Sequence, residues 1–154
     1  MTDSTIFNEL AQIPILEELS QEELKVVAPY WRYLDLPPSE ILFSEGDPAD
    51  ALYYVLEGEL IIYKGNNSAI PFEISRVVAN QFFGEQAVLD NTVRSGTLQA
   101  ATTTRLLVLK KDDFYEIIEK HQHIGVILLK GLARYLSLQL RKTTGQFIAI
   151  HQAL

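Results

Sequence analysis

The sequence predicts a mainly β fold with flanking helices, and this prediction depends on two observations. Between residues 30 and 110, short apolar stretches alternate with turn residues at the spacing of an antiparallel sandwich or barrel. Residues 5–29 and 111–143 instead carry apolar side chains at the spacing of helices. We therefore expect one domain over residues 1–154, with a helical lead-in, a β region and closing helices. The tail, residues 144–154, shows no clear pattern.

The lead-in should contain short helices. Ser20 and Glu23 form a capping box, which predicts a helix that starts after Ser20 and stops before Pro29. An earlier helix has one apolar face, made by Ile6, Leu10 and Ile13. We expect both helices to contribute packing rather than a binding site.

The β region divides into strands separated by glycine and proline. Turns are expected at Glu45–Pro48 and at Glu57–Gly58, and a loop is expected at Gly65–Ser68. The expected strands are Trp31–Leu36, Glu40–Phe43, Ala51–Leu56, Glu59–Lys64, Phe72–Val78, Gly96–Ala101 and Arg105–Leu109.

The last third returns to helix. Asp112 and Asp113 can cap a first helix, and a longer one should run from about Ile124 to Thr143. Its apolar stripe consists of Leu129, Leu132, Leu136 and Leu140, widened by Leu128 and Tyr135. Because this stripe is wider than one contact requires, one side should pack on the β core and the other should cover a ligand or pair with a second copy. The candidates are Leu129, Leu132 and Tyr135 for the lid, and Leu136 and Leu140 for a dimer seam.

Composition narrows the functions open to the chain. Its 154 residues are 47% hydrophobic and 21% charged, which is ordinary for one folded domain. The net charge of −7 argues against direct binding to DNA and against an anionic membrane surface. The chain has no cysteine, which excludes disulfides and thiolate chemistry and is typical of a cytoplasmic protein. We see neither a signal peptide nor an apolar run of about 18 residues, and so expect no membrane span.

One stretch, Phe82–Ala101, combines residues suited to a small phosphate ester. Gly84 allows backbone to approach a ligand closely, and the apolar patch Ala87–Leu89 is long enough for a short helix with free N–H groups at its start. Glu85 can accept a hydrogen bond from a sugar hydroxyl, and Arg94 presents a planar charged fork to phosphate oxygens. The alternative is a surface loop with a salt bridge between Glu85 and Arg94.

The order of these elements resembles the cyclic-nucleotide-binding domain family over roughly residues 10–142. Ile41–Asp50 is similar to the family's turn before its third strand, and Leu52–Leu60 to its strand-turn-strand core. Phe83-Gly84-Glu85 through Arg94-Ser95 resembles its phosphate-binding cassette. The resemblance implies an antiparallel double-stranded β-helix, a jelly-roll-like β-roll, closed by a C-terminal helix pair acting as lid or dimer helix.

The resemblance also implies roles for individual residues. Glu85 would hold the ribose 2′-hydroxyl, and Arg94 would hold the exocyclic phosphate oxygens. The cradle would be completed by backbone N–H groups around Gly84, Gln86, Ala87, Ser95 and Gly96. The chain departs from the family pattern at Gln86, Val93 and Gly96, and a glycine in place of the frequent alanine should loosen this segment by up to about 1 kcal/mol.

We therefore expect a non-enzymatic sensor that binds cyclic AMP, or cyclic GMP, without a cofactor, and that signals to an unknown protein partner by moving its C-terminal helix. A homodimer through residues 124–143 is also expected, whereas the residues after Thr143 are too few for a helix-turn-helix domain. One alternative is the same fold used only for dimerisation or protein interaction. Another is a metal-dependent enzyme, which is disfavoured because His121, His123 and His151 all lie outside the β region. We expect no metal site.

Overall fold

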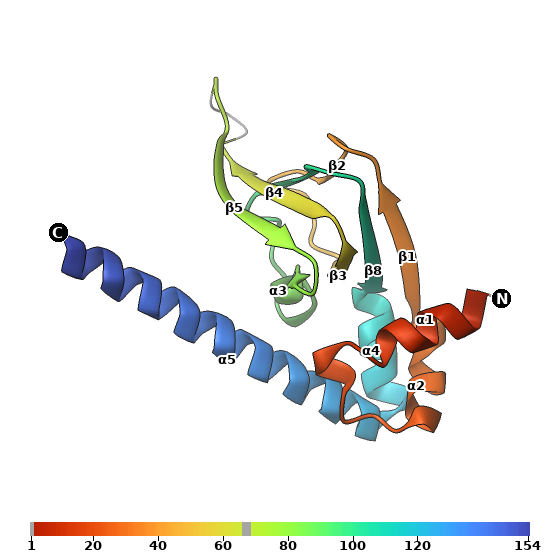
Figure 1. The fold of residues 1–154 in the computed structure, drawn as a ribbon. Coiled ribbons are helices and arrows are strands. Elements are labelled where there is room, and N and C mark those ends of the chain that lie inside the picture. Colours follow the sequence, from red (N-terminus) through yellow and green to blue (C-terminus); the bar gives the residue numbers. More distant parts are fainter. Residues whose placement is uncertain (1, 66–68) are drawn as a thin grey trace. The chain divides into compact units, whose positions relative to one another are not determined.

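The computed structural model describes residues 2–65 and 69–154, which divide into two compact units (Figure 1). One unit is Pro29–Glu116, and the other combines the residues up to Ala28 with Ile117–Leu154. The loop expected at Gly65–Ser68 falls largely on residues 66–68, which lie outside the described residues.

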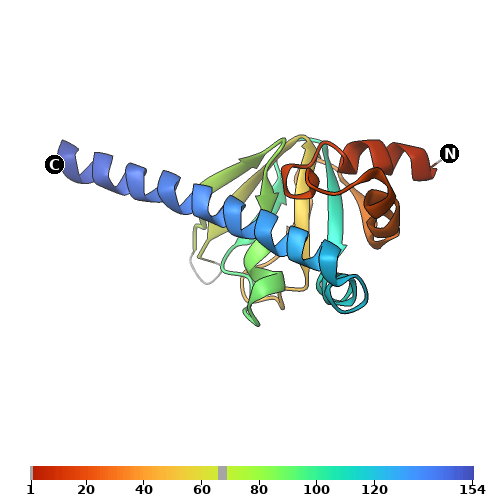
Figure 2. The ribbon, with the colours of Figure 1, turned by 90° about the horizontal axis from the view of Figure 1, so that it is seen from below.

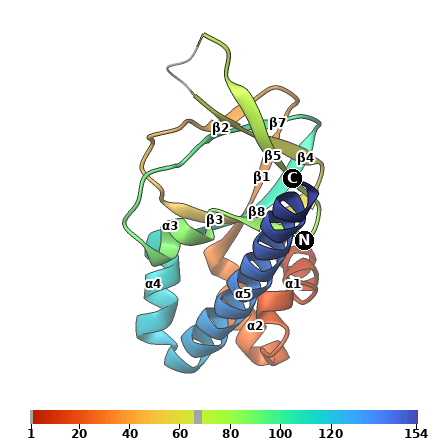
Figure 3. The same ribbon diagram turned by 90° about the vertical axis from the view of Figure 1, so that its left-hand side faces the viewer.

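The first unit is built from two four-stranded antiparallel sheets, with strand orders β1-β8-β3-β6 and β2-β7-β4-β5 (Figure 3). The strands are β1 (Trp31–Leu36), β2 (Ile41–Phe43), β3 (Ala51–Glu57), β4 (Glu59–Lys64), β5 (Phe72–Val78), β6 (Phe82–Phe83), β7 (Thr97–Ala100) and β8 (Thr104–Lys110). Alternate side chains of both sheets form one core, which includes Leu36, Val55, Leu60, Leu98 and Leu106. The predicted mainly β fold is therefore confirmed.

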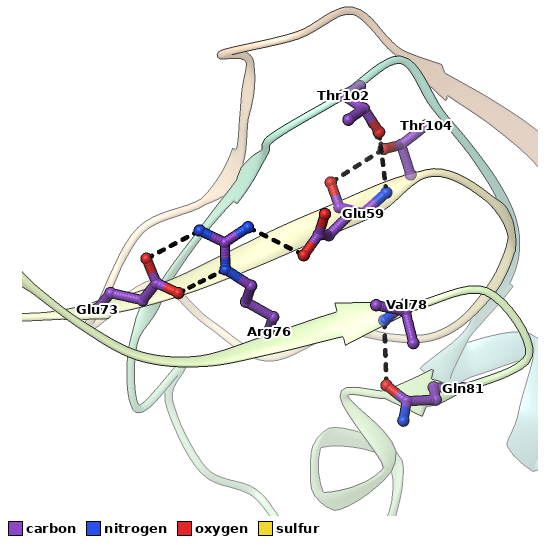
Figure 4. Close-up of polar contacts among 7 residues, drawn as sticks. All are labelled: Glu59, Glu73, Arg76, Val78, Gln81, Thr102 and Thr104. Carbon is purple, nitrogen blue, oxygen red and sulfur yellow. Dashed lines mark hydrogen bonds and ion pairs between the residues drawn. The ribbon is translucent and has the colours of Figure 1, made fainter.

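The turn between β3 and β4 packs tightly against the turn that precedes β8. Gly58 has a φ of +95°, and a β-carbon placed on it would lie 2.5 Å from the carbonyl oxygen of Thr103. The Glu59 N–H donates to the Thr102 hydroxyl at 3.1 Å, and the Thr104 hydroxyl donates to the Glu59 carbonyl at 3.3 Å (Figure 4). Only glycine fits this approach, which fixes the register of the strands on either side.

The helices are α1 (Thr2–Leu10), η1 (Pro14–Leu16), α2 (Gln21–Val27), η2 (Ala28–Tyr30), α3 (Glu85–Leu89), α4 (Lys111–Lys120) and α5 (Gln122–Ala153). The predicted capping box is present at the start of α2, where the Ser20 N–H donates to Glu23 Oε2 at 2.8 Å and the Glu23 N–H donates to Ser20 Oγ at 3.2 Å. The expected apolar face of the first helical segment is buried at Ile6, Leu10 and Ile13.

α5 is one unbroken helix of 32 residues (Figure 2), so the predicted end at Thr143 was wrong, and the tail, which showed no clear pattern, continues the helix as far as Ala153. Helical hydrogen bonding continues through Thr143, Thr144 and Gly145 although these residues are weak helix formers. Within the described residues, no helix is long and apolar enough to cross a membrane.

The predicted apolar stripe of α5 was also partly wrong. The buried residues are Ile124, Gly125, Leu128 and Leu132. Leu129 is 38% exposed and Leu140 is 68% exposed, whereas Leu132, expected in the lid, is only 1% exposed. The spacing of the leucines allowed two overlapping stripes, and η1 packs on the one that runs through Leu128 and Leu132.

Charged side chains reinforce the contact between α5 and the lead-in. Glu18 accepts from Arg134 Nη1 at 3.0 Å and from Lys130 Nζ at 3.3 Å. Hydrogen bonds from Arg134 and Lys130 hold the pKa of Glu18 below its ordinary value. All three side chains are partly exposed, so solvent screens this network and it adds only a little to the packing.

Candidate ligand-binding site

The backbone of Arg94 is held against the turn between β2 and β3. The Arg94 N–H donates to the Asp47 carbonyl at 2.8 Å, and the Gly46 N–H donates back to the Arg94 carbonyl at 2.9 Å. An isolated antiparallel bridge joins the neighbouring residues Pro48 and Val93. The turn predicted at Glu45–Pro48 therefore fixes where the arginine side chain starts.

The guanidinium of Arg94 is buried but only loosely paired. Its side chain is 5% exposed, and its Nη2 donates to the Ala51 carbonyl at 3.3 Å and to Asp50 Oδ1 at 3.5 Å, both long hydrogen bonds. Its Nε is buried and has no hydrogen-bond partner in the described part of the chain. The ion pair recorded for Arg94 is thus with Asp50, not with Glu85 as the salt-bridged loop would require.

Gly84 lies beside this guanidinium. It follows β6, has a φ of +75° and is the N-cap of α3. A β-carbon placed on Gly84 would lie 2.7 Å from the Ala51 carbonyl oxygen and 2.9 Å from Arg94 Nη1. The structure therefore brings Gly84 and Arg94, which are ten residues apart in the sequence, to one place.

Glu85 follows Gly84 directly and is partly buried. Burial raises the pKa of its carboxyl above the ordinary value, and a hydrogen bond from backbone only partly opposes this. A hydroxyl group that donated to this carboxylate would favour its ionised form.

The other predicted site residues lie on both sides of this pair. Gln86 and Ser95 are exposed, and the Ser95 carbonyl accepts a hydrogen bond from Lys64 Nζ at 2.9 Å. Ala87 is buried, and its N–H donates to the Gly84 carbonyl at 3.0 Å.

Gly96 is buried, and a β-carbon placed on it would lie 2.9 Å from the Tyr63 carbonyl oxygen. An alanine would therefore press on β4. We expected a glycine at position 96 only to loosen the segment, but the close approach of its backbone to Tyr63 also leaves little room for a side chain.

Residues that the sequence reasoning did not assign to the site also surround Arg94. The Arg94 Cζ lies 4.1 Å from the centroid of the Phe43 ring and 5.5 Å from that of Tyr53. Asp50, which pairs with Arg94, is in turn held by Lys111, whose backbone N–H donates to the Asp50 carbonyl at 2.8 Å and whose Nζ donates to Asn91 Oδ1 at 2.6 Å. These contacts join segments that are distant in the sequence, and no local pattern could have indicated them.

The histidines do not gather into a metal site. In the ranges that the structure describes, no three side chains of the metal-binding types come together. His123 instead lies 3.1 Å from Glu23, through its Nε2.

Comparison with known proteins gives a consistent result. The profile of the cyclic nucleotide-binding domain matches residues 33–121. A cyclic nucleotide-gated potassium channel from Mesorhizobium japonicum is 29% identical over 121 residues, which cover 79% of this chain and 32% of the channel. The cyclic AMP receptor protein of Thermus thermophilus is 27% identical over 123 residues, which cover 80% of this chain and 57% of the receptor. The chain thus spans about a third to just over half of the length of these relatives.

A solved structure is similar over nearly the whole chain. The crystal structure of a cyclic nucleotide-binding domain from Methylobacillus flagellatus superposes with a TM-score of 0.80 at 25% identity. The superposition covers 96% of this chain and 83% of that one.

Proposed function

Because the chain belongs to the cyclic nucleotide-binding domain family, we propose that it binds a cyclic purine nucleotide, cyclic AMP first and cyclic GMP as the alternative. The observation that carries the proposal is the buried, loosely paired guanidinium of Arg94 beside Gly84. A cyclic phosphate has one negative charge, which a single guanidinium can neutralise through two parallel hydrogen bonds. An unpaired Nε at a 5% exposed side chain is costly unless such a partner arrives.

In this proposal each predicted residue has a separate task. Arg94 binds the exocyclic phosphate oxygens and Glu85 accepts the ribose 2′-hydroxyl. Backbone at Gly84, Gln86, Ala87, Ser95 and Gly96 lines the phosphate. The protein binds without catalysis, because these tasks need hydrogen bonds and charge but no nucleophile.

Calorimetry with cyclic AMP and cyclic GMP tests this function. We expect heat of binding and a rise in the unfolding temperature with at least one of them, because a ligand that binds only the folded state stabilises it. Linear 5′-AMP, which has the same base but a different phosphate geometry, should bind much more weakly. If neither cyclic nucleotide gave heat or a thermal shift at millimolar concentration, the proposal would be wrong.

We further propose that the nucleotide acts as a signal by shifting the position of α5. Of the lid candidates, Leu129 and Tyr135 are not fully buried, whereas Leu132 is only 1% exposed. Hydrogen exchange of α5 amides with and without cyclic AMP measures this effect. Equal hydrogen exchange with and without cyclic AMP would contradict the proposed signalling step, but it would not contradict binding.

A second candidate function, self-association through α5, is favoured by a separate observation. Beyond Leu132, no residue of α5 is buried. Its apolar residues nevertheless continue at heptad spacing, interrupted by one polar residue, Thr143, and the full set is Leu129, Ala133, Leu136, Leu140, Thr143, Phe147, Ile150 and Leu154. We name this set the α5 seam. The seam fits a coiled coil with a second copy, because the basic residues Arg134, Arg141 and Lys142 lie away from it and no acidic residue follows Glu119.

Sedimentation of two matched variants tests the seam. Leu140→Glu places a charge in the seam and should turn a dimer into a monomer. Leu138→Glu, at a 58% exposed leucine outside the seam, should leave the dimer intact. A monomeric wild-type protein at about 100 μM, well above the micromolar range of stable association, would rule out the homodimer.

A further inference from the structure

Three aromatic rings form a cluster beneath the Arg94 guanidinium. Tyr53 and Phe83 are cross-strand partners on β3 and β6, and their rings stack at 4.8 Å with planes only 6° apart. Phe43, at the end of β2 in the other sheet, lies 6.2 Å from the Tyr53 ring and 6.3 Å from the Phe83 ring. The cluster therefore joins the two sheets next to Gly84, which directly follows Phe83.

Arg94 lies face-on to one member of this cluster. Its Cζ is 4.1 Å from the Phe43 centroid, within the range of a cation–π contact and closer than its 5.5 Å to Tyr53. Its hydrogen bonds to Asp50 and Ala51 are long and its Nε is unpaired among the described residues, so apart from a polar contact with Tyr53 little hydrogen bonding fixes the plane of the guanidinium. The Phe43 ring face supplies the missing constraint.

We propose that Phe43 is a positioning residue that holds the Arg94 guanidinium in the plane needed to receive an anion. Two-point recognition of phosphate depends on this plane, since both N–H groups must point at the same pair of oxygens. Phe43 and the backbone clamp on Arg94 come from the same segment, β2 and the turn after it, so this segment sets both the origin and the orientation of the side chain. The effect on ligand affinity rests on the proposed function, whereas the stack itself does not.

The stack can be measured in the protein without ligand. A ring face shifts the NMR signal of a proton above it upfield, so the Arg94 Nε–H signal, assigned by its loss in Arg94→Lys, should be upfield of those of exposed arginines. Phe43→Leu should move it back, and Phe43→Tyr, which keeps the ring face, should not. Phe82→Leu is the matched control, because Phe82 is a buried aromatic paired with Tyr54, 4.7 Å between ring centroids, and its side chain alternates to the opposite face of β6 from Phe83. An Arg94 signal that is the same in wild type and Phe43→Leu would overturn the proposal.

Affinity for cyclic AMP then tests the consequence for binding. We expect Phe43→Leu to weaken binding about tenfold, in the range of a desolvated cation–π contact, and Phe43→Tyr and Phe82→Leu to bind as the wild type does. A loss in Phe82→Leu as large as that in Phe43→Leu would show that only core packing matters, and would refute the positioning role. If the wild type binds no cyclic nucleotide, the proposed function fails while the NMR measurement still decides whether Phe43 orients Arg94.

Discussion

Arg94 and Arg76 have the same side chain in opposite situations. Arg76, on β5, is 47% exposed, and its guanidinium donates to Glu73 Oε1 at 2.6 Å, to Glu73 Oε2 at 3.2 Å and to Glu59 Oε1 at 3.0 Å (Figure 4). Arg94 is 5% exposed, its hydrogen bonds to Asp50 and Ala51 are long, Tyr53 is a further polar neighbour, and its Nε is unpaired within the described residues. The arginine that could be hydrated by water has the better protein partners, and the one shielded from water has the poorer ones.

This difference separates a structural role from a binding role. An exposed, well-paired arginine is screened by solvent and contributes modestly to stability. A buried and loosely paired one is unfavourable for folding unless a further partner pairs with it, which is the role proposed for a ligand phosphate. The predictions below test this contrast, from the largest expected effect to the smallest.

Replacing the two arginines should give opposite results. Arg94→Gln removes the charge that would face the phosphate and should weaken cyclic AMP binding at least about 100-fold, equivalent to the loss of two charge-assisted hydrogen bonds. Arg76→Gln should leave affinity unchanged and lower the free energy of unfolding by less than about 1 kcal/mol. Calorimetry and chemical denaturation measure the two quantities. Equal affinity in Arg94→Gln and wild type would refute the assignment of the site.

Two glycines extend the contrast to the backbone. Gly84→Ala would place a methyl group 2.9 Å from Arg94 Nη1 at a φ of +75°, so it should lower stability by about 2–3 kcal/mol and also weaken binding. Gly46 has a similar φ of +90° but no atom within 4 Å of the added β-carbon. Gly46→Ala should therefore cost only about 1 kcal/mol of stability, from backbone strain. If both variants reduced affinity equally, close contact at Gly84 would not be the cause.

The smallest effect concerns the pH dependence of binding. Burial raises the folded-state pKa of Glu85, and a ribose hydroxyl that donates to Glu85 needs the ionised carboxylate. Affinity for cyclic AMP should therefore be full above this raised pKa and fall as the pH drops through it. Titration from about pH 8 to about pH 5 measures the fall, which Glu85→Gln should abolish. A slope that persists in Glu85→Gln would assign the titration to another group.

The same carboxyl has the opposite effect on the free protein. Because its pKa is higher in the folded than in the unfolded state, Glu85 opposes folding when ionised. This unfavourable contribution is present above the folded-state pKa and disappears below the ordinary value of 4.5. Binding and stability of the wild type should therefore respond to Glu85 in opposite directions over this pH range.

Alternating strands could be predicted from the sequence, but very short ones could not. β1 and β5 have the predicted bounds because prolines mark one end of each, Pro37 after β1 and Pro71 before β5. β6 has only Phe82 and Phe83, too few to show any period, and was missed. The end of α5 was misplaced because Thr143, Thr144 and Gly145 are weak helix formers, whereas the seam residues Phe147 and Ile150 continue the heptad spacing beyond them.

The candidate site could be proposed from the sequence where its residues lie in one segment. Gly84, Glu85 and Arg94 lie within ten positions of one another in the sequence. The resemblance to a family linked them to a ligand. Phe43 and Asp50 come from another segment, more than 40 residues before Arg94, and only the fold brings them to it. The sequence also did not decide which of two apolar stripes of α5 is buried, because leucines spaced by three and four residues fit either face.

Gly131 has a mechanical consequence for α5. A β-carbon placed on it would lie 2.7 Å from the Ile15 carbonyl oxygen and 2.8 Å from the Ile15 Cα. The backbones of α5 and η1 are therefore in close contact, and beside this contact Lys130 and Arg134 donate hydrogen bonds to Glu18. A slide or roll of α5 by one residue would drive a larger side chain into Ile15. Any displacement of α5 must therefore carry Pro14–Leu16 with it, so α5 and η1 should move together as one rigid unit.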